Sequence, residues 1–87
     1  MPKRLELDGE YDLARLAEVR DIFEAVDERA VVIDFGTVTY VDSLFLQEMI
    51  KLHRRLPSGA VTLVNVDNNI RRLLELMGLD QMFTIVS

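Results

Sequence analysis

Asp42 and Ser43 stand together in the segment YVDSLFL (residues 40–46), where an apolar run meets the start of a helical pattern. One role for such residues is capping, in which a side-chain oxygen accepts a hydrogen bond from a backbone amide of the first helical turn. A second role is regulation, because an exposed serine hydroxyl can be phosphorylated and the positive end of a helix favours the added negative charge. The residue types leave both roles open.

Ser43 has no partner for nucleophilic catalysis. A serine nucleophile needs a base within hydrogen-bond reach, and the single histidine, His53, lies ten residues further along the same predicted helix. That spacing separates the two side chains by about 15 Å along the helix axis. One histidine without any cysteine supplies no zinc ligand set, and the chain contains no glycine-rich phosphate-binding motif. The sequence therefore predicts no catalytic residue, no metal site and no cofactor.

The composition restricts the classes of partner. The 87 residues predict one domain, residues 1–87, in which 10 basic residues face 15 acidic residues and give a net charge of −5. This charge disfavours binding to nucleic acid and to anionic lipid. No apolar run approaches the roughly 20 residues of a membrane-spanning helix, and the N-terminal segment MPKRLELDGE lacks the apolar core of a signal peptide. We expect a cytoplasmic protein with no nucleic-acid partner and no direct membrane insertion.

The hydrophobic pattern of the first half of the chain predicts a strand, a helix and a second strand. Residues 5–8 alternate apolar and charged side chains as a half-buried strand does, and Gly9 then indicates a turn. Residues 13–26 carry apolar side chains at spacings of three and four, with Asp12 placed to cap the first turn. Residues 30–35, AVVIDF, form a β-branched run typical of a buried strand, and a loop through residues 36–39 follows.

The second half repeats this alternation. A helical period runs from Leu46 to Leu56 and stops at residues 57–59, PSG, before a strand over residues 60–66. Asp67 then opens a helix that ends at Gly78, and residues 82–86 form a last short strand.

Strands alternating with helices predict an α/β fold: a single small domain with a mostly parallel four-stranded sheet and helices packed against it. Partners of such sheets tend to meet the C-terminal ends of the strands. Asp34, Asp42 and Ser43 all fall at that predicted edge.

Three blocks of the sequence resemble the STAS domains, the family of sulphate transporter and anti-sigma factor antagonist domains. The segment VVIDFGTVTYVDSLFLQEMI resembles the family's signature, in which a strand ending in Asp-Leu-Ser precedes Asp-Ser-Ser-Gly or Asp-Ser-Thr-Gly at a helix start. LDGEYD resembles the family's early turn, and VNVDNNIRRLLELMGLDQMFTIV resembles its later strand, helix and closing strand. The blocks keep the family's order and cover most of the chain.

The resemblance implies a STAS-like α/β domain with a mixed sheet, and it implies a function. Ser43 falls on the serine that partner kinases phosphorylate in anti-sigma factor antagonists. Asp42 falls on the family aspartate that precedes this serine, Asp12 on the aspartate of the early turn, and Asp34 on the aspartate that closes the central strand. In that family the unphosphorylated antagonist binds an anti-sigma factor with serine kinase activity, phosphorylation breaks the complex, and a phosphatase can reverse the change. The antagonist itself is not an enzyme.

The sequence departs from the family pattern after Ser43 and in its length. Leu44 and Phe45 stand where the family has Ser or Thr followed by Gly, and Gly36 replaces the serine of Asp-Leu-Ser. We expect Leu44 and Phe45 to contribute to a partner-binding surface, with packing of Phe45 inside the domain as the alternative. Compared with many members, the chain has one strand fewer before the early turn and no C-terminal helix, which predicts an uncovered edge or face and leaves a homodimer open.

Three hypotheses for function remain. The first is an anti-sigma factor antagonist switched at Ser43, with partner-binding residues Asp12, Asp34, Asp42, Ser43, Leu44 and Phe45. The second is an unphosphorylated STAS subunit of a lipid-transport ATPase complex or a stress-signalling scaffold. The third is a small enzyme or nucleotide-binding domain that uses Asp34, Asp42 and Ser43.

Overall fold

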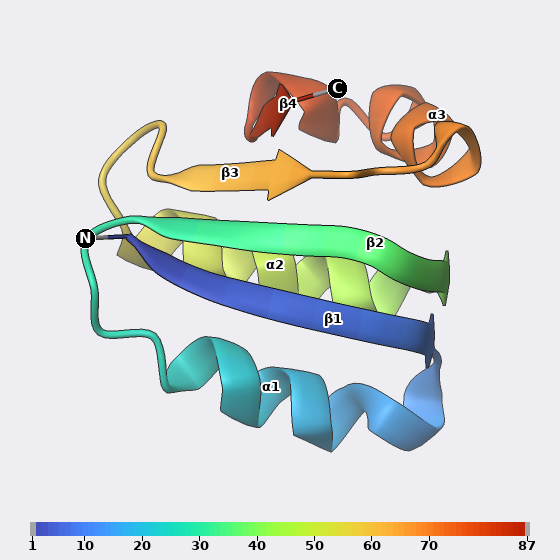
Figure 1. The fold of residues 1–87 in the computed structure, drawn as a ribbon, viewed down its shortest axis with the longest axis horizontal. Coiled ribbons are helices and arrows are strands. Elements are labelled where there is room, and N and C mark those ends of the chain that lie inside the picture. The colour runs from blue at the N-terminus through green and yellow to red at the C-terminus, as the bar shows by residue number, and fades with distance from the viewer. Residues whose placement is uncertain (1, 87) are drawn as a thin grey trace.

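The computed structural model describes residues 2–86, which form a four-stranded sheet with helices packed against it (Figure 1). The strands are β1 (Lys3–Tyr11), β2 (Val31–Val41), β3 (Val61–Val64) and β4 (Thr84–Val86). The α-helices are α1 (Leu16–Glu24), α2 (Ser43–Arg55) and α3 (Asn68–Leu76). Two short 3-10 helices, η1 (Leu13–Arg15) and η2 (Leu79–Gln81), precede α1 and β4. The predicted alternation of strands and helices is confirmed.

All neighbouring strands of the sheet pair in parallel, in the order β1-β2-β3-β4. The α/β class and the parallel pairing are confirmed, whereas residues 2–86 contain none of the antiparallel pairing that a mixed sheet implies. The connections explain this difference. Each strand is followed by a helical segment before the next strand begins, and such a crossover returns the chain to start the next strand in the same direction.

The second strand is longer than the sequence predicts. β2 continues to Val41 through residues 36–39, where we predicted a loop. Its register against β1 shifts twice, after Asp34 and after Val38, and each shift adds one residue to β2. The buried side chains Phe35, Val38 and Val41 are therefore three residues apart instead of two, which removes the alternation by which a strand is recognised.

Gly9 lies inside β1, so the predicted turn at this position is wrong. Its φ of 68° falls in the left-handed region that favours glycine, and a Cβ atom added there would lie 3.3 Å from a guanidinium nitrogen of Arg15. Arg15 supports this part of β1, because it donates a hydrogen bond of 2.6 Å to the carbonyl oxygen of Asp8 and lies 4.1 Å from the centroid of the Tyr11 ring. The strand consequently continues to Tyr11.

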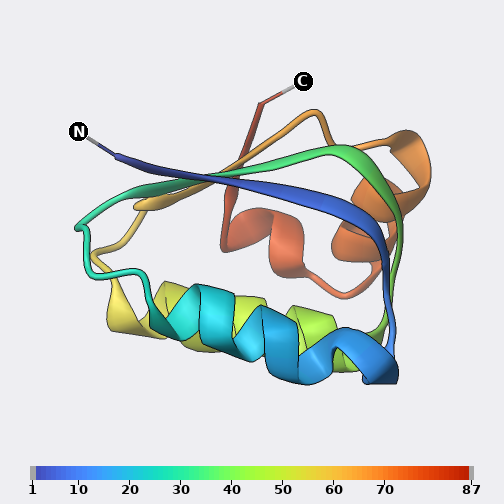
Figure 2. The ribbon, with the colours of Figure 1, turned by 60° about the horizontal axis from the view of Figure 1, so that its bottom comes forward.

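The hydrophobic core lies between one face of the sheet and the helices. Figure 2 shows α1 and α2 side by side on this face, while the opposite face carries no helix of residues 2–86. The core includes Leu5, Leu7, Val19, Phe23, Ile33, Phe35, Phe45, Leu46, Met49, Leu52, Leu63, Ile70 and Leu74. Leu13 does not join it, although the helical period placed it on the buried side. The first turn is the separate 3-10 helix η1, and Leu13 is 69% exposed.

Polar contacts between side chains of α2 and the α1 segment hold the two helices side by side. The side chain of Glu48 is only 6% exposed, and its Oε2 accepts hydrogen bonds from Arg20 at 3.4 Å and from Lys51 at 3.1 Å. Burial alone would raise the pKa of Glu48, but these two cations outweigh it and hold the pKa below its ordinary value. Arg55 donates hydrogen bonds to the carbonyl oxygens of Phe23 and Val26 at the end of α1. These contacts join α2 to α1, in addition to the core packing of α2.

Candidate functional site

The C-terminal ends of β1 and β2 bring Asp12 and Ser43 to one edge of the sheet. Tyr11 and Val41 pair at the end of the two strands, and the backbone amide of Asp42 donates a hydrogen bond of 3.1 Å to the carbonyl oxygen of Tyr11. Immediately beyond this point η1 begins at Leu13 and α2 begins at Ser43. Residues that are about 30 positions apart in the sequence therefore start two helices at the same edge.

Asp12 and Asp42 both act as N-caps. The carboxylate of Asp42 accepts a hydrogen bond of 2.9 Å from the amide of Phe45, and the carboxylate of Asp12 accepts one of 3.0 Å from the amide of Ala14. Asp42 thus provides a hydrogen-bond acceptor for a backbone amide in the first turn of α2. Ser43 is the first residue of the helix, and its side chain is exposed. The capping role belongs to Asp42, which leaves the hydroxyl of Ser43 available for another role.

Phe45 lies in the core, so the prediction that its ring faces a partner at this edge is wrong. The side chain is 1% exposed, and its ring centroid lies 5.1 Å from that of Tyr11, 5.9 Å from that of Phe23 and 6.0 Å from that of Phe35. The alternative reading, packing inside the domain, is the observed one. Leu44 is half-buried beside the exposed Ser43.

Two exposed apolar residues at this edge were missed by reasoning from the sequence. Leu13, next to Asp12, is 69% exposed, and Tyr40, two residues before Asp42, is 50% exposed. Leu13 was assigned to the core because it matched the helical period, and Tyr40 was given no role beyond the apolar run that precedes Asp42. We call Asp12, Leu13, Tyr40, Ser43 and Leu44 the Ser43 edge. It combines a carboxylate, a free hydroxyl and three large apolar or aromatic side chains, the composition of a protein-binding surface.

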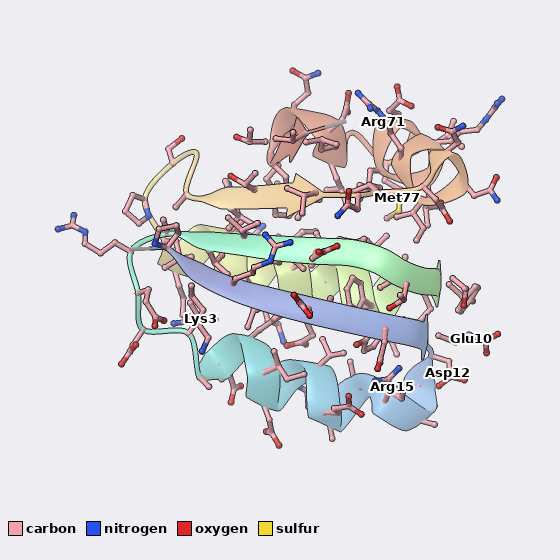
Figure 3. The ribbon with its side chains drawn as sticks, in the orientation of Figure 1. Lys3, Glu10, Asp12, Arg15, Arg71 and Met77 are labelled. Carbon is pink, nitrogen blue, oxygen red and sulfur yellow. The ribbon has the colours of Figure 1, made fainter. Side chains whose placement is uncertain are left out.

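The electrostatics around the Ser43 edge are acidic. Glu10 and Asp12 are exposed near the end of β1, where Figure 3 shows them close to Arg15. The guanidinium of Arg15 is already engaged, because it forms ion pairs of 2.7 Å with Glu18 and 2.9 Å with Asp8. The hydrogen bonds with Glu18 and Asp8 raise the pKa of Arg15. Arg15 is thus occupied by Glu18 and Asp8, while Glu10 and Asp12 remain exposed acids at the end of β1.

Asp34 lies away from the Ser43 edge, in the interior of β2. The sequence placed it at the strand end, but β2 continues for seven further residues to Val41. Its Oδ1 accepts hydrogen bonds from the Asn65 side chain at 3.0 Å and from the Gly36 amide at 2.8 Å, and its Oδ2 pairs with Arg4 at 2.6 Å. Both oxygens are used by Arg4, Gly36 and Asn65, so the structure does not bring Asp34 together with Asp42 and Ser43.

These contacts predict an acid-sensitive contribution of Asp34 to stability. The hydrogen bond from Asn65, with those from Gly36 and Arg4, lowers the pKa of Asp34 below its ordinary value of 3.8. A carboxylate with a lowered folded-state pKa stabilises the fold at pH values above its unfolded-state pKa, and this stability is lost as the pH falls through the folded-state pKa. We expect the urea midpoint of the wild-type chain to decrease below about pH 4.

The matched control for this prediction is Asp34→Asn, which keeps a side-chain acceptor but cannot ionise. Urea midpoints of both chains measured from about pH 6 to about pH 2 should differ at the neutral end and converge at the acidic end. Parallel curves for the two chains would show that the ionisation of Asp34 does not stabilise the fold.

His53 is separate from the Ser43 edge. Its ring lies 5.6 Å from that of Phe83 in an edge-to-face contact, and its buried Nδ1 has no hydrogen-bond partner among residues 2–86. Within the same residues no helix is long and apolar enough to cross a membrane. No group of three or more His, Cys, Asp or Glu side chains in this part of the chain is arranged to hold a metal ion.

Comparison with solved structures shows similarity to proteins of two functional classes. A sulfate transporter family protein from Wolinella succinogenes superposes with a TM-score of 0.72 at 11% identity, over 94% of this chain and 75% of that chain. The unphosphorylated anti-sigma factor antagonist SpoIIAA superposes with a TM-score of 0.70 at 21% identity, over 100% of this chain and 83% of that chain. SpoIIAA from Bacillus in its phosphorylated form superposes with a TM-score of 0.65 at 20% identity, over 97% of this chain and 81% of that chain. At these identities the similarity shows the fold.

Comparison of sequences identifies the family. A STAS-domain containing protein from Pseudomonas aeruginosa (strain UCBPP-PA14) is 27% identical over 85 residues, which cover 93% of this chain and 84% of that protein. Residues 2–87 match the family profile described as "Mlab, STAS domain". With the parallel sheet, the capped start of α2 and the exposed serine that follows the cap, this match shows that the chain belongs to the STAS domain family.

Proposed function

We propose that this protein is a cytoplasmic anti-sigma factor antagonist whose binding is switched by phosphorylation of Ser43. In this proposal the unphosphorylated Ser43 edge binds an anti-sigma factor with serine kinase activity, the kinase modifies Ser43, and a phosphatase restores the binding form. The protein acts by binding and is the substrate of the kinase. The observation that carries the proposal is the exposed Ser43 hydroxyl at the first position of α2, beside a residue that already caps the helix.

The surroundings of Ser43 suit a switch that acts without unfolding the domain. Asp42 caps α2 whether or not Ser43 is modified, because its carboxylate accepts the hydrogen bond from the Phe45 amide. A phosphoserine carries about −1.5 to −2 charges and three strong acceptor oxygens. At the start of α2 the positive helix end favours this group, so the fold tolerates it.

The same added charge opposes a bound partner. Leu13, Tyr40 and Leu44 are the apolar side chains of the Ser43 edge, and a partner that binds over Leu44 also meets the adjacent Ser43. Burying a doubly charged phosphate without a cationic partner is costly, and Glu10, Asp12 and Asp42 add repulsion. Because Phe45 is buried in the core, it does not hinder the approach of a kinase to the Ser43 hydroxyl.

The test of this proposal is mass spectrometry of the intact protein purified from its own host, with fragmentation to locate any phosphate. We expect a fraction of the chains to carry one phosphate on Ser43, with a share that differs between growth and stress conditions. A Ser43→Ala chain expressed in the same host is the matched control and should carry none. Wild-type chains without phosphate at Ser43 under both conditions would contradict the switch.

A second candidate function is an unphosphorylated subunit of a transport assembly, such as a lipid-transport ATPase complex. The similarity to a sulfate transporter family protein, together with the "Mlab" family description, supports this alternative. The exposed Leu13 and Tyr40 would then belong to a lasting interface. Stoichiometric co-purification of the chain with transporter subunits would favour this function, and co-purification with a kinase would favour the antagonist.

A further inference from the structure

A groove lies between α1 and α2, the two helices that Figure 2 shows side by side. Its lining residues are Phe23 and Glu24 from α1 and Glu48, Lys51, Leu52 and Arg55 from α2. The groove has a volume of about 160 Å³, which is below the roughly 300–1,000 Å³ of pockets that hold drug-sized ligands. It therefore suits a single side chain better than a cofactor.

The groove is separate from the Ser43 edge. Ser43 and Glu48 are five residues apart on α2, which places their side chains about 140° apart around the helix and about 7.5 Å apart along it. A ligand in the groove consequently does not depend on the proposed switch at Ser43.

Glu48 brings a carboxylate with one free oxygen to the groove. Its side chain is 6% exposed, and the hydrogen bonds from Arg20 and Lys51 both end on Oε2. No hydrogen bond from residues 2–86 reaches Oε1. Within these residues only His53 Nδ1 is a fully enclosed side-chain atom without a partner, so Oε1 of Glu48 stays accessible from outside. Because Glu48 lines the groove, a donor placed there can reach this oxygen.

The rest of the groove suits an aromatic ring. Phe23 and Leu52 are buried and supply its apolar part. The guanidinium of Arg55 is held in place by hydrogen bonds of 2.6 Å to the carbonyl oxygen of Phe23 and 3.2 Å to that of Val26. A fixed guanidinium can stack on the face of an aromatic ring, and Lys51 adds a second cation to the groove.

The charges around the groove favour a neutral donor over a cationic one. Lys51 and Arg55 line the groove, and Arg20 is bonded to Glu48, so three cations surround the two acids Glu24 and Glu48. A lysine or arginine side chain of a partner would meet net repulsion there. The indole of tryptophan is neutral, has an N–H donor and no acceptor, and offers the best face for a cation–π contact.

We propose that the groove between α1 and α2 binds a tryptophan side chain of a partner protein. The indole N–H donates a hydrogen bond to Oε1 of Glu48. The ring packs on Phe23 and Leu52, and the guanidinium of Arg55 lies against its face. Tryptophan is enriched among the residues that dominate the binding energy of protein interfaces, where they fill desolvated pockets. The groove thus gives the domain a contact surface in addition to the Ser43 edge.

The absence of tryptophan from the chain makes the proposal directly testable, because the fluorescence of an added indole then has no background from the protein. The probe is N-acetyl-tryptophanamide, titrated with the wild-type chain. We expect a saturable change in indole emission with a dissociation constant on the order of 1 mM, as suits one side chain without the rest of an interface. Amide NMR spectra of the isotope-labelled chain should show shifts centred on Phe23 and Leu52 and none at Ser43.

Two changes isolate the hydrogen bond to Glu48. The probe methylated at its indole nitrogen keeps the ring but has no donor, and it should bind the wild-type chain at least about tenfold more weakly. Glu48→Leu removes the acceptor and should weaken the unmethylated probe by a similar factor. Glu24→Gln is the matched control, because Glu24 is an exposed acid of the same groove and its replacement should leave the dissociation constant unchanged.

The methylated probe is measured on the wild-type chain, so it decides the test even if Glu48→Leu does not fold. The proposal would be overturned by a lack of saturable binding, by equal affinity for the methylated and unmethylated probes, or by amide shifts that lie outside the groove. Tighter binding of N-acetyl-tyrosinamide than of N-acetyl-tryptophanamide would overturn the choice of tryptophan. None of these results changes the expected phosphorylation of Ser43.

Discussion

Replacement of Phe45 by alanine is expected to lower the free energy of unfolding by about 3–5 kcal/mol. The ring is 1% exposed and contacts the rings of Tyr11, Phe23 and Phe35, so its removal takes away buried area and leaves a cavity between the sheet, α1 and α2. A chain of this length has a total stability of roughly 4–13 kcal/mol, of which this loss is a large part. Urea unfolding monitored by circular dichroism measures this loss in the free energy of unfolding.

Two control variants separate core packing from a surface role for this segment. Phe45→Leu keeps an apolar side chain in the same space and should cost less than Phe45→Ala. Leu44→Ala changes the half-buried neighbour and should also cost less, because fewer of its contacts are lost. Equal and small losses for Phe45→Ala and Leu44→Ala would contradict the position of Phe45 in the core.

The second large effect is expected on partner binding, and it rests on the proposed function. A Ser43→Asp chain should bind its anti-sigma factor at least about tenfold more weakly than the wild-type chain, which corresponds to about 1.4 kcal/mol or more. The added carboxylate places a further negative charge at the Ser43 edge, beside Asp42. Isothermal titration calorimetry with the purified partner measures the change.

Unlike the affinity for the anti-sigma factor, the free energy of unfolding should not decrease in the Ser43→Asp chain. Ser43 is exposed at the start of α2, where a negative charge is favourable, so Ser43→Asp should unfold at the same urea concentration as the wild-type chain or at a slightly higher one. Ser43→Ala, which adds no charge, is the matched control and should bind with wild-type affinity. Wild-type affinity of Ser43→Asp would show that the charge at this position does not control binding.

The parts of the fold that follow from local pattern were predictable from the sequence. Asp42 and Asp67 were identifiable as helix starts because capping depends on residues three positions apart, and both accept the expected hydrogen bonds. The parallel sheet followed from strands that alternate with helices, since a helical crossover fixes the direction of the next strand. The exposed position of Ser43 next to the cap followed from the same local rule.

The errors concern features that depend on contacts between distant segments. The second half of β2 was assigned to a loop because its two bulges depend on pairing with β1, about 30 residues earlier. This assignment also put Asp34 at a strand end. Phe45 was expected at a partner-binding surface, with packing inside the domain as the alternative, and the choice depends on rings contributed by β1, α1 and β2.

The sequence by itself determined the order of the strands and helices, the capped start of α2 and the serine that follows the cap, because each depends on residues within a few positions of one another. Only the tertiary structure decided what surrounds that serine. The pairing of β1 with β2 sets Leu13 and Tyr40 at the Ser43 edge, the core takes Phe45 away from it, and the interior of β2 holds Asp34 at a distance. These positions depend on strand register and core packing, which join residues that are far apart in the chain.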